Sequence, residues 1–228
     1  MPRLRLATYN IPCGIGRDGR FSERRILDVL REMDPDVVAL QEVESRASGI
    51  DMLAWLAKET GMHAVAGTTL MTADGHYGNG LLARCPITHV EQVDLTWERR
   101  EPRNAIACDL DCQGERIRVV ATHLGLRPAE RRHQIQRLLP LFSERPDDRA
   151  VLAGDLNEWF LWGRPLRWLH RYFVATPALS TFPAWYPVLA LDRVWSHPGA
   201  ILQDLDVHVS AMARAASDHL PLVAELQW

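Results

Sequence analysis

The chain lacks several features that would direct it to duplex nucleic acid or to a membrane. Its 228 residues carry a formal net charge of −3, so it has no basic excess of the kind that duplex-binding proteins usually carry. No apolar run reaches the roughly 18 residues that a membrane span requires. Residues 1–6 also lack the apolar segment of a signal peptide. We therefore expect a cytoplasmic protein without a transmembrane segment.

Cysteine is scarce as well. The four cysteines are Cys13, Cys85, Cys108 and Cys112. They form no CxxC pair and show no spacing typical of a zinc site. We interpret them as reduced, small hydrophobic residues in or near the core.

What the chain does have is a composition suited to a large core. It is 47% hydrophobic and 24% charged, and no repeat, linker or low-complexity segment divides it, so we expect one domain over residues 1–228. Apolar patterning predicts helices over residues 22–33 and 50–60 and from Pro128 onward. It predicts strands over residues 4–9, 37–40, 63–67, 77–83, 87–94, 104–111, 116–122, 150–157, 191–196, 202–209 and 220–227. Many strands with few helices indicate an α/β fold in which two sheets pack face to face with helices outside.

One stretch, residues 150–157, carries the strongest chemical signal. Four apolar residues are followed by Gly154, Asp155, Leu156 and Asn157. If the strand continues to its end, Asp155 and Asn157 point to the same side. A carboxylate that accepts a proton, beside an amide that orients a water, suits hydrolysis. A plain strand-end turn explains the same residues on structural grounds.

Polar residues also interrupt other strands where those strands end. These positions are Asn10, Glu42, His123, Asp155, Asn157, Asp192 and the pair Asp218–His219. Turn chemistry alone explains scattered examples. Glu42 and Asp192, however, directly abut apolar runs and are costly to bury unpaired. Several carboxylates brought together need a cation, and oxygen ligands suit Mg²⁺ or Mn²⁺ better than zinc.

At this point the motifs resemble those of the endonuclease/exonuclease/phosphatase superfamily of metal-dependent phosphohydrolases, which includes DNase I-like nucleases. The resemblance runs from Ala7 to the C-terminus and implies a four-layer α/β sandwich with two mixed sheets. It rests on eight pieces in order: Thr8–Tyr–Asn10, Asp36–Val–Val–Ala–Leu–Gln–Glu42, Gly78–Asn–Gly–Leu–Leu82, Pro102–Arg103, Thr122–His–Leu124, Gly154–Asp–Leu–Asn157, Leu191–Asp–Arg193 and Ser217–Asp–His–Leu–Pro221.

The resemblance also implies roles at the site. Glu42 and Asp218 are expected to ligate the metal, and Asn10 to contact metal or phosphate. Asp155 is expected to activate or position the water, which Asn157 fixes, and His219, oriented by Asp192, to face the phosphate. Whether Asp155 or the His219–Asp192 pair acts as the base stays open. His123 and Arg103 are expected to bind the developing phosphoryl charge.

The resemblance leaves the substrate broad. Pro12 stands where some related nucleases have an acidic residue, so we predict one dominant Mg²⁺, for which Mn²⁺ can substitute. The expected activity is a Mg²⁺-dependent phosphoesterase, first a phosphodiesterase or nuclease cleaving P–O bonds by in-line water attack on a nucleic acid or a small phosphodiester. The alternatives are a phospholipid or inositol-phosphate hydrolase and an inactive binding module.

Residues 158–187 are rich in aromatic side chains and are expected to form a wall beside the site. Their tryptophans suit contacts with bases, sugars or lipid, but we expect more than half of these tryptophans to pack in the core. Arg164, Arg167 and Arg171 recur at helical spacing and suit either a phosphate-facing rim or a solvated face.

Overall fold

A computed structural model describes residues 1–45, 49–145 and 148–228 of the chain. Its strands form two mixed sheets. The six-stranded sheet, in the order β10–β11–β1–β2–β4–β3, contains β1 (Arg3–Asn10), β2 (Val37–Glu44), β3 (His63–Thr72), β4 (Gly75–Ala83), β10 (Leu202–Val207) and β11 (Leu222–Gln227). The five-stranded sheet, in sequence order, contains β5 (Ile87–Asp94), β6 (Asn104–Cys112), β7 (Glu115–His123), β8 (Ala150–Asp155) and β9 (Asp192–His197).

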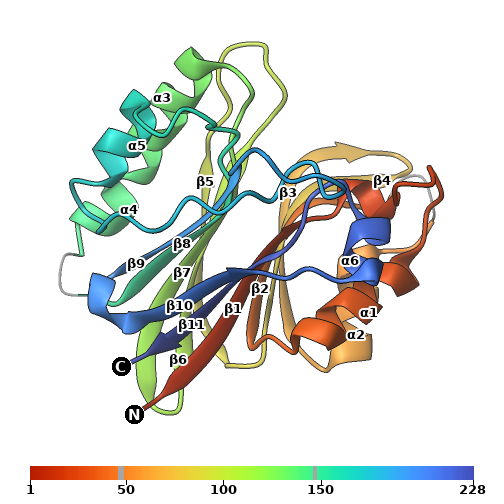
Figure 1. Ribbon diagram of the computed structural model, residues 1–228, viewed down its shortest axis with the longest axis horizontal. Coiled ribbons are helices and arrows are strands. Elements are labelled where there is room, and N and C mark those ends of the chain that lie inside the picture. The colour runs from red at the N-terminus through yellow and green to blue at the C-terminus, as the bar shows by residue number, and fades with distance from the viewer. Residues whose placement is uncertain (46–48, 146–147) are drawn as a thin grey trace.

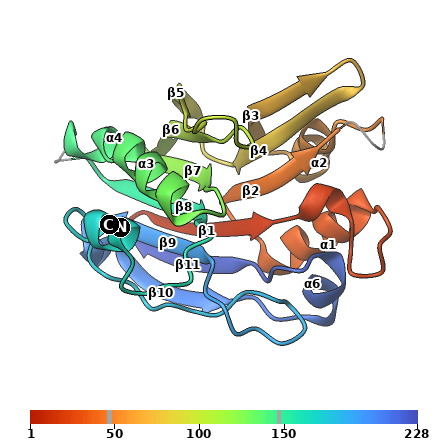
Figure 2. The ribbon, with the colours of Figure 1, turned by 90° about the horizontal axis from the view of Figure 1, so that it is seen from above.

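Helices cover the outer face of each sheet, so the molecule has four layers, as Figure 1 and Figure 2 show. The six-stranded sheet carries α1 (Glu23–Met33), α2 (Met52–Thr60) and α6 (Ala211–Ala216). The five-stranded sheet carries α3 (Pro128–Leu138), α4 (Pro140–Ser143) and α5 (Arg164–Leu169). Short 3₁₀ turns lie at Pro12–Gly14 and Gly199–Ile201. The expected fold class, a four-layer sandwich of two mixed sheets with helices outside, is confirmed.

Strand alternation explains why both faces of the sheets are covered. In β1, Leu4 and Leu6 enter the apolar layer between the sheets, whereas Ala7 and Tyr9 pack towards the helices. A third apolar cluster, which includes Leu152 and Phe142, joins the five-stranded sheet to α3–α5. A strand that is buried on both faces has a nearly continuous apolar sequence, which is why the sequence pattern predicted these strands.

Each sheet contains one parallel pair of strands. β1 pairs with β2 and β7 pairs with β8 in parallel, whereas the other pairings of described strands are antiparallel. The carboxyl ends of both pairs lie at the same end of the sandwich, where Asn10 from β1 meets Asp155 from β8. Ligands of open α/β sheets bind outside the carboxyl ends of strands. Two sheets therefore supply one site.

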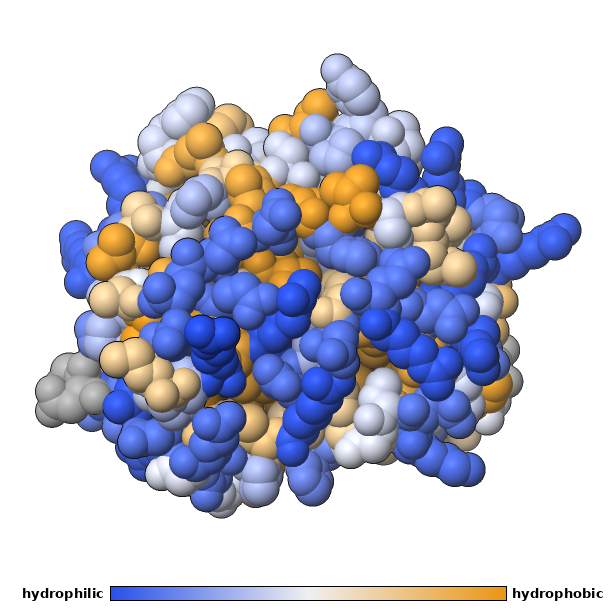
Figure 3. Space-filling view, turned by 60° about the horizontal axis from the view of Figure 1, so that its bottom comes forward, coloured by the Kyte–Doolittle hydropathy of each residue, from blue (hydrophilic) through white to orange (hydrophobic). Residues whose placement is uncertain are grey.

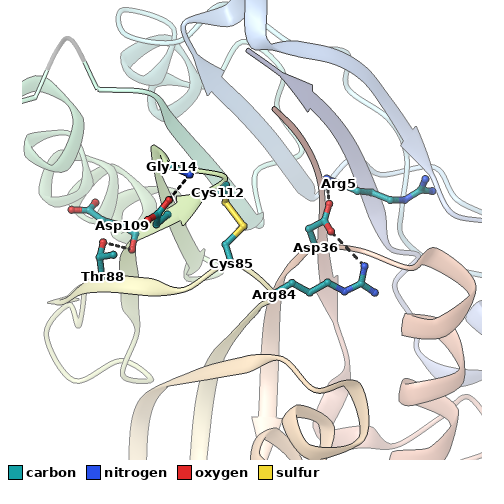
Figure 4. Close-up of a disulfide and its surroundings, with 9 residues drawn as sticks. Arg5, Asp36, Arg84, Cys85, Thr88, Asp109, Cys112 and Gly114 are labelled. Carbon is teal, nitrogen blue, oxygen red and sulfur yellow. Dashed lines mark hydrogen bonds and ion pairs between the residues drawn. A yellow bond between two sulfur atoms is a disulfide. The ribbon is translucent and has the colours of Figure 1, made fainter. Parts of the chain in front are cut away.

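Two cysteines form a disulfide, so the interpretation of all four as reduced is wrong. Cys85 lies in the segment that passes from β4 to β5, and Cys112 ends β6; their sulfur atoms are bonded and their Cα atoms are 5.3 Å apart (Figure 4). Of the two cysteines outside this disulfide, Cys108 is buried and Cys13 partly so. The pair is 27 residues apart in sequence, and the antiparallel pairing of β5 with β6, in which Ile87 lies opposite Leu110, brings its members together.

No helix in the described parts of the chain is long and apolar enough to cross a membrane. Polar side chains cover most of the face shown in Figure 3, with apolar ones between them.

Candidate active site

A β-bulge places the first carboxylate of the site. The register between β2 and β4 shifts between Leu40 and Val43, and Glu42 adopts a left-handed φ of 57°. Such a backbone costs on the order of 1–3 kcal/mol for a residue other than glycine and persists where the surroundings impose it. The buried amide of Gln41 holds the bulge by donating to Thr8 Oγ1 at 3.2 Å. The Glu42 carboxylate consequently accepts a hydrogen bond from Asn10 Nδ2 at 3.3 Å.

Asp155 lies at the centre of the site. Its Oδ2 accepts a hydrogen bond from Asn10 Nδ2 at 3.1 Å. The same oxygen lies 3.6 Å from His123 Nε2 and 3.8 Å from His219 Nε2. Gly154 makes this position accessible: its φ is 153°, and a Cβ there would lie 1.9 Å from the carbonyl oxygen of Thr122. Burial, with the charge of Asp192 adding to it, raises the pKa of Asp155 to about 6.

Asn157 reaches the site by a route that differs from the expected one. The strand ends at Asp155, and Asn157 has a left-handed φ of 50°, so strand alternation does not align the two side chains. The Asn157 backbone N–H donates to Asp155 Oδ1 at 2.9 Å, and its side-chain amide donates to the carbonyl of Leu124 at 2.9 Å. Asn157 Nδ2 then lies 3.1 Å from His123 Nε2. Asparagine tolerates the left-handed region better than most residues.

His219 is bound to an acidic partner. Its Nδ1 lies 2.9 Å from Asp192 Oδ2, which also accepts a hydrogen bond from Thr181 Oγ1 at 2.5 Å. Ser217 Oγ accepts from the His219 backbone N–H at 3.0 Å. Burial alone would lower the pKa of His219, but the charge and hydrogen bond of Asp192 raise it to about 10. The ring is therefore an imidazolium at neutral pH.

His123 has the opposite environment. Arg103 Nη1 lies 3.0 Å from its Nδ1, and the amide nitrogen of Asn157 faces its Nε2. Burial, and then the positive charges of Arg103 and His219, hold the pKa of His123 well below its usual range. This imidazole is neutral, and Arg103 beside it is 7% exposed.

The donor atoms of the site fit a hard divalent cation. Asn10 Oδ1 and Asp218 Oδ1 are buried, yet neither accepts a hydrogen bond from any described residue. Burial raises the pKa of Glu42, and the nearby charge of Asp218 adds to this effect. These two oxygens without partners, together with the Glu42 carboxylate beside them, suit Mg²⁺ or a similar ion.

A second cluster of ligand atoms, from Asp155, Asp192 and His219, lies within 4.8 Å of one another. It fits a metal less well, because Asp192 Oδ2 already accepts two hydrogen bonds. We therefore interpret this cluster as a hydrogen-bonded network beside the cation site.

The structure brings all the sequence-predicted site residues to this end of the sandwich. They are Asn10, Glu42, Arg103, His123, Asp155, Asn157, Asp192, Asp218 and His219. Sequence reasoning missed Thr181 and assigned no role to Ser217, which donates to the Asn10 carbonyl at 2.7 Å. Phe182, from the segment expected to form a wall beside the site, has its ring centroid 4.8 Å from that of His219. Thr181 and Phe182 belong to an irregular segment with no periodicity that would have signalled them.

The expectation that more than half of the tryptophans of residues 158–187 pack in the core is wrong, because Trp159, Trp162 and Trp185 are exposed. Among the nine aromatic side chains of this segment, Phe173 is buried, and Trp168, Tyr172 and Phe182 are partly buried. The exposed ones are Trp159, Phe160, Trp162, Trp185 and Tyr186. The segment runs over the surface after β8 and has only the short α5 to bury its side chains.

The site geometry agrees with the comparison to known families. The model of the Endonuclease/Exonuclease/phosphatase family matches residues 7–219, which span every residue of the site. The chain belongs to this family. Its members are generally hydrolytic phosphoesterases that depend on divalent metals.

Three similar proteins or solved structures agree with this family or with its fold. The Escherichia coli K12 protein YbhP is 31% identical over 244 aligned residues, which cover 98% of this chain and 96% of that protein. An endonuclease/exonuclease/phosphatase structure from Beutenbergia cavernae has a TM-score of 0.82 at 25% identity and covers 100% of this chain and 72% of that one. The human Nocturnin catalytic domain, at 19% identity, shares the fold with a TM-score of 0.74, over 99% of this chain and 93% of that one.

Proposed function

We propose that this protein is a Mg²⁺-dependent phosphodiesterase that cleaves a P–O bond by in-line attack of water, and that residues 1–228 act as one cytoplasmic domain. The observation that carries the proposal is the position of the Asp155 carboxylate. It lies between a neutral histidine and a protonated one and beside Asn10, which it shares with Glu42. Phosphoryl transfer needs this combination of a proton acceptor, positive charge and oriented donors.

Glu42, Asp218 and Asn10 would hold the cation. A bound Mg²⁺ would neutralise charge on the phosphoryl oxygens. The buried, unsatisfied oxygens of Asn10 and Asp218 support this assignment, since a buried acceptor without a partner costs about 1–3 kcal/mol unless something binds it.

Asp155 is the better base of the two that the sequence left open. A protonated His219 cannot take a proton from water, whereas a carboxyl with a pKa of about 6 is ionised at neutral pH and basic enough to accept one. Asn157, whose backbone is bound to Asp155, would position the same water.

The two histidines would act on the phosphate in different ways. His219, held by Asp192, presents a positive charge to the phosphoryl oxygens. His123 is neutral and serves as a hydrogen-bonding wall next to Arg103, whose planar guanidinium matches two phosphate oxygens. These charges favour the transition state, where negative charge on the phosphoryl group develops.

The substrate class has two candidates. A nucleic acid or a small phosphodiester is the first. A phospholipid is the second, and the exposed aromatic side chains of residues 159–186 favour it.

A substrate panel with one matched variant tests the proposal. Wild type and Glu42→Gln are assayed with Mg²⁺ on a bis-aryl phosphodiester, an aryl monoester, plasmid DNA and phospholipid, and Mg²⁺ binding is measured by calorimetry. We expect Mg²⁺-dependent turnover of a diester and weaker Mg²⁺ binding by Glu42→Gln at an unchanged melting temperature. Hydrolysis that EDTA leaves unaffected, or equal Mg²⁺ binding by both proteins, contradicts it.

A further inference from the structure

Large apolar side chains are exposed on three loops, which we treat as two segments because Arg131 joins the loops after β7 and β8. We call them the apolar rim: Leu126 after β7 and Phe160, Leu161 and Trp162 after β8 make the first segment, and Trp185 and Tyr186 make the second. Trp162 is 74% exposed and Tyr186 is 72% exposed. Consecutive exposed apolar residues are uncommon on soluble proteins unless they serve an interaction.

Both segments of the rim begin at the active site. Phe160 follows Asn157 by three residues, and Leu126 follows His123 by three. On the other segment, Ala184 N–H donates to the carbonyl of Asp218 at 2.7 Å, and Trp185 is the next residue. The loops that carry the apolar rim therefore begin beside residues of the site.

The first segment is held in its exposed position by buried groups. Glu158, 2% exposed, accepts hydrogen bonds from Arg131 Nε and from the Phe160 backbone N–H, both at 3.1 Å. The guanidinium of the fully buried Arg131 lies 5.2 Å from the ring centroid of Trp159 and donates to the carbonyl of Leu126 at 2.6 Å. One buried ion pair thus anchors both parts of this segment while Leu161 and Trp162 point to solvent.

Arginine side chains accompany the rim. Arg127 follows Leu126 and Arg164 lies two residues after Trp162, and both are exposed. Arg100 and Arg127 line a pocket of about 260 Å³ that Leu126 and the active-site residue Arg103 also line. The two acidic residues of this pocket have partners other than Arg100 and Arg127: Glu101 pairs with Arg103 at 3.0 Å, and Glu130 accepts from Gln134 at 3.5 Å.

We propose that the apolar rim docks the active site onto an anionic phospholipid surface. Exposed tryptophan, leucine and arginine side chains on these loops match the interfacial zone of a bilayer, where aromatic rings lie among headgroups and cations meet anionic lipid. The inference uses the proposed function only to locate the site. Docking itself is a binding property and is measured without turnover.

The composition of the rim favours lipid over single-stranded nucleic acid. Nucleobases stack on flat aromatic faces, whereas the exposed Leu126 and Leu161 offer no such face. Aliphatic and aromatic side chains together suit acyl chains and the headgroup boundary.

Vesicle sedimentation in EDTA, which prevents metal-dependent turnover, tests docking. Wild type is mixed with vesicles of phosphatidylcholine alone or with phosphatidylglycerol added. We expect binding to the anionic vesicles, weakened by salt, and a loss of about tenfold or more in partition coefficient for the double variant Leu161→Ser/Trp162→Ser. Arg127→Gln/Arg164→Gln should lose roughly tenfold on anionic vesicles alone.

The matched control is Val90→Ser/Val174→Ser. Both valines are exposed, by 41% and 67%, and lie away from the rim: Val90 on β5 and Val174 against Gly199, beyond the far end of β9. This variant should bind anionic vesicles like wild type. Hydrolysis of a soluble diester by Leu161→Ser/Trp162→Ser should equal wild type, which separates docking from catalysis.

Three outcomes overturn the proposal. The first is wild type that stays in the supernatant with both kinds of vesicle. The second is an oligonucleotide affinity that falls in Leu161→Ser/Trp162→Ser while vesicle binding does not. The third is a wild-type dimer that the same variant converts to a monomer, which would make the rim a subunit interface. Failure of the soluble-diester assay with intact vesicle binding would instead count against the proposed function.

Discussion

The two buried histidines of the site differ in what surrounds them rather than in where they lie. His123 and His219 are 3% and 6% exposed, and each places Nε2 within 4 Å of Asp155 Oδ2, at 3.6 and 3.8 Å. His123 faces an arginine and an amide nitrogen, whereas His219 faces a carboxylate. The same side chain is therefore neutral on one side of Asp155 and positively charged on the other.

This contrast shows how one carboxylate can be kept basic and yet placed near positive charge. A second imidazolium would stabilise ionised Asp155 further and weaken it as a base. With one neutral and one charged ring, the proton acceptor and the phosphoryl-binding charge are separated across a few ångströms. The residues that surround each histidine therefore determine which ring is neutral and which is charged.

The largest effect is expected from removing the group that both histidines share. Asp155→Asn keeps the shape and the hydrogen bond from Asn10 but not the basicity, so turnover of the best panel substrate should fall about a hundredfold or more. Asp111→Asn, at the far end of β6, is the control and should behave like wild type. Undiminished turnover by Asp155→Asn would show that Asp155 is not the base.

The next effect separates the two histidines directly. His219→Ala should lower kcat by about a hundredfold with Mg²⁺ binding retained, whereas His123→Ala should mainly raise KM, by roughly tenfold, because the neutral ring contributes contacts rather than charge. Steady-state kinetics on the same diester measure both. His208→Ala, which removes a partner of Glu32 outside the site, should leave both parameters unchanged. Equal changes of kcat and KM in His219→Ala and His123→Ala would show that the different environments of the two histidines do not matter for catalysis.

A smaller effect follows from the raised pKa of His219. Its ordinary pKa is 6.5 and its folded pKa about 10, so protonation stabilises the fold fully below pH 6.5 and this stabilisation is lost as pH rises through about 10. The melting temperature of the metal-free protein should therefore fall over that interval, by roughly 2–4 °C for each kcal/mol lost. Asp192→Asn should flatten this dependence. An identical pH profile for wild type and Asp192→Asn would contradict it.

The smallest effect on activity is expected at the opposite end of the sandwich. Cys85→Ser/Cys112→Ser removes a disulfide that lies before β7 begins, whereas His123 is at the end of that strand. Stability should drop by roughly 2–4 kcal/mol in denaturant titrations, while kcat stays at the wild-type value. Cys108→Ala serves as the unpaired control. A changed kcat in the double serine variant would show that the disulfide influences the site.

The sequence predicted those parts of the fold that depend on local patterns. Apolar alternation identified the strands, and Ser22 and Gly61 marked the start of α1 and the end of α2, where the structure has them as caps. The polar residues at strand ends were also identified, because they follow apolar runs in the sequence. The parallel pairs then bring such strand ends together, wherever they lie in the chain. Helix α6, although capped by Ser210, was not among the expected elements.

What the sequence could not predict depends on strand pairing and on irregular backbone. The bulge at Glu42 arises from the register with β4, and the disulfide from the pairing of β5 with β6. Thr181 reaches Asp192 from an irregular segment. The left-handed turn at Asn157 replaced the strand alternation from which its position was inferred. No local periodicity reports these arrangements, because none of them follows the repeat of a single strand or helix.

The hydrogen bond from Asn10 to Asp155 spans the two sheets, since one residue ends β1 and the other ends β8. Its length of 3.1 Å therefore depends on the spacing between the two sheets at that end of the sandwich. Side chains deep between the sheets, such as Ile106 and Val119, help to set this spacing. A change of side-chain volume between the sheets would alter their spacing. It would therefore change the distance between Asn10 and Asp155, and with it catalysis, without touching the site.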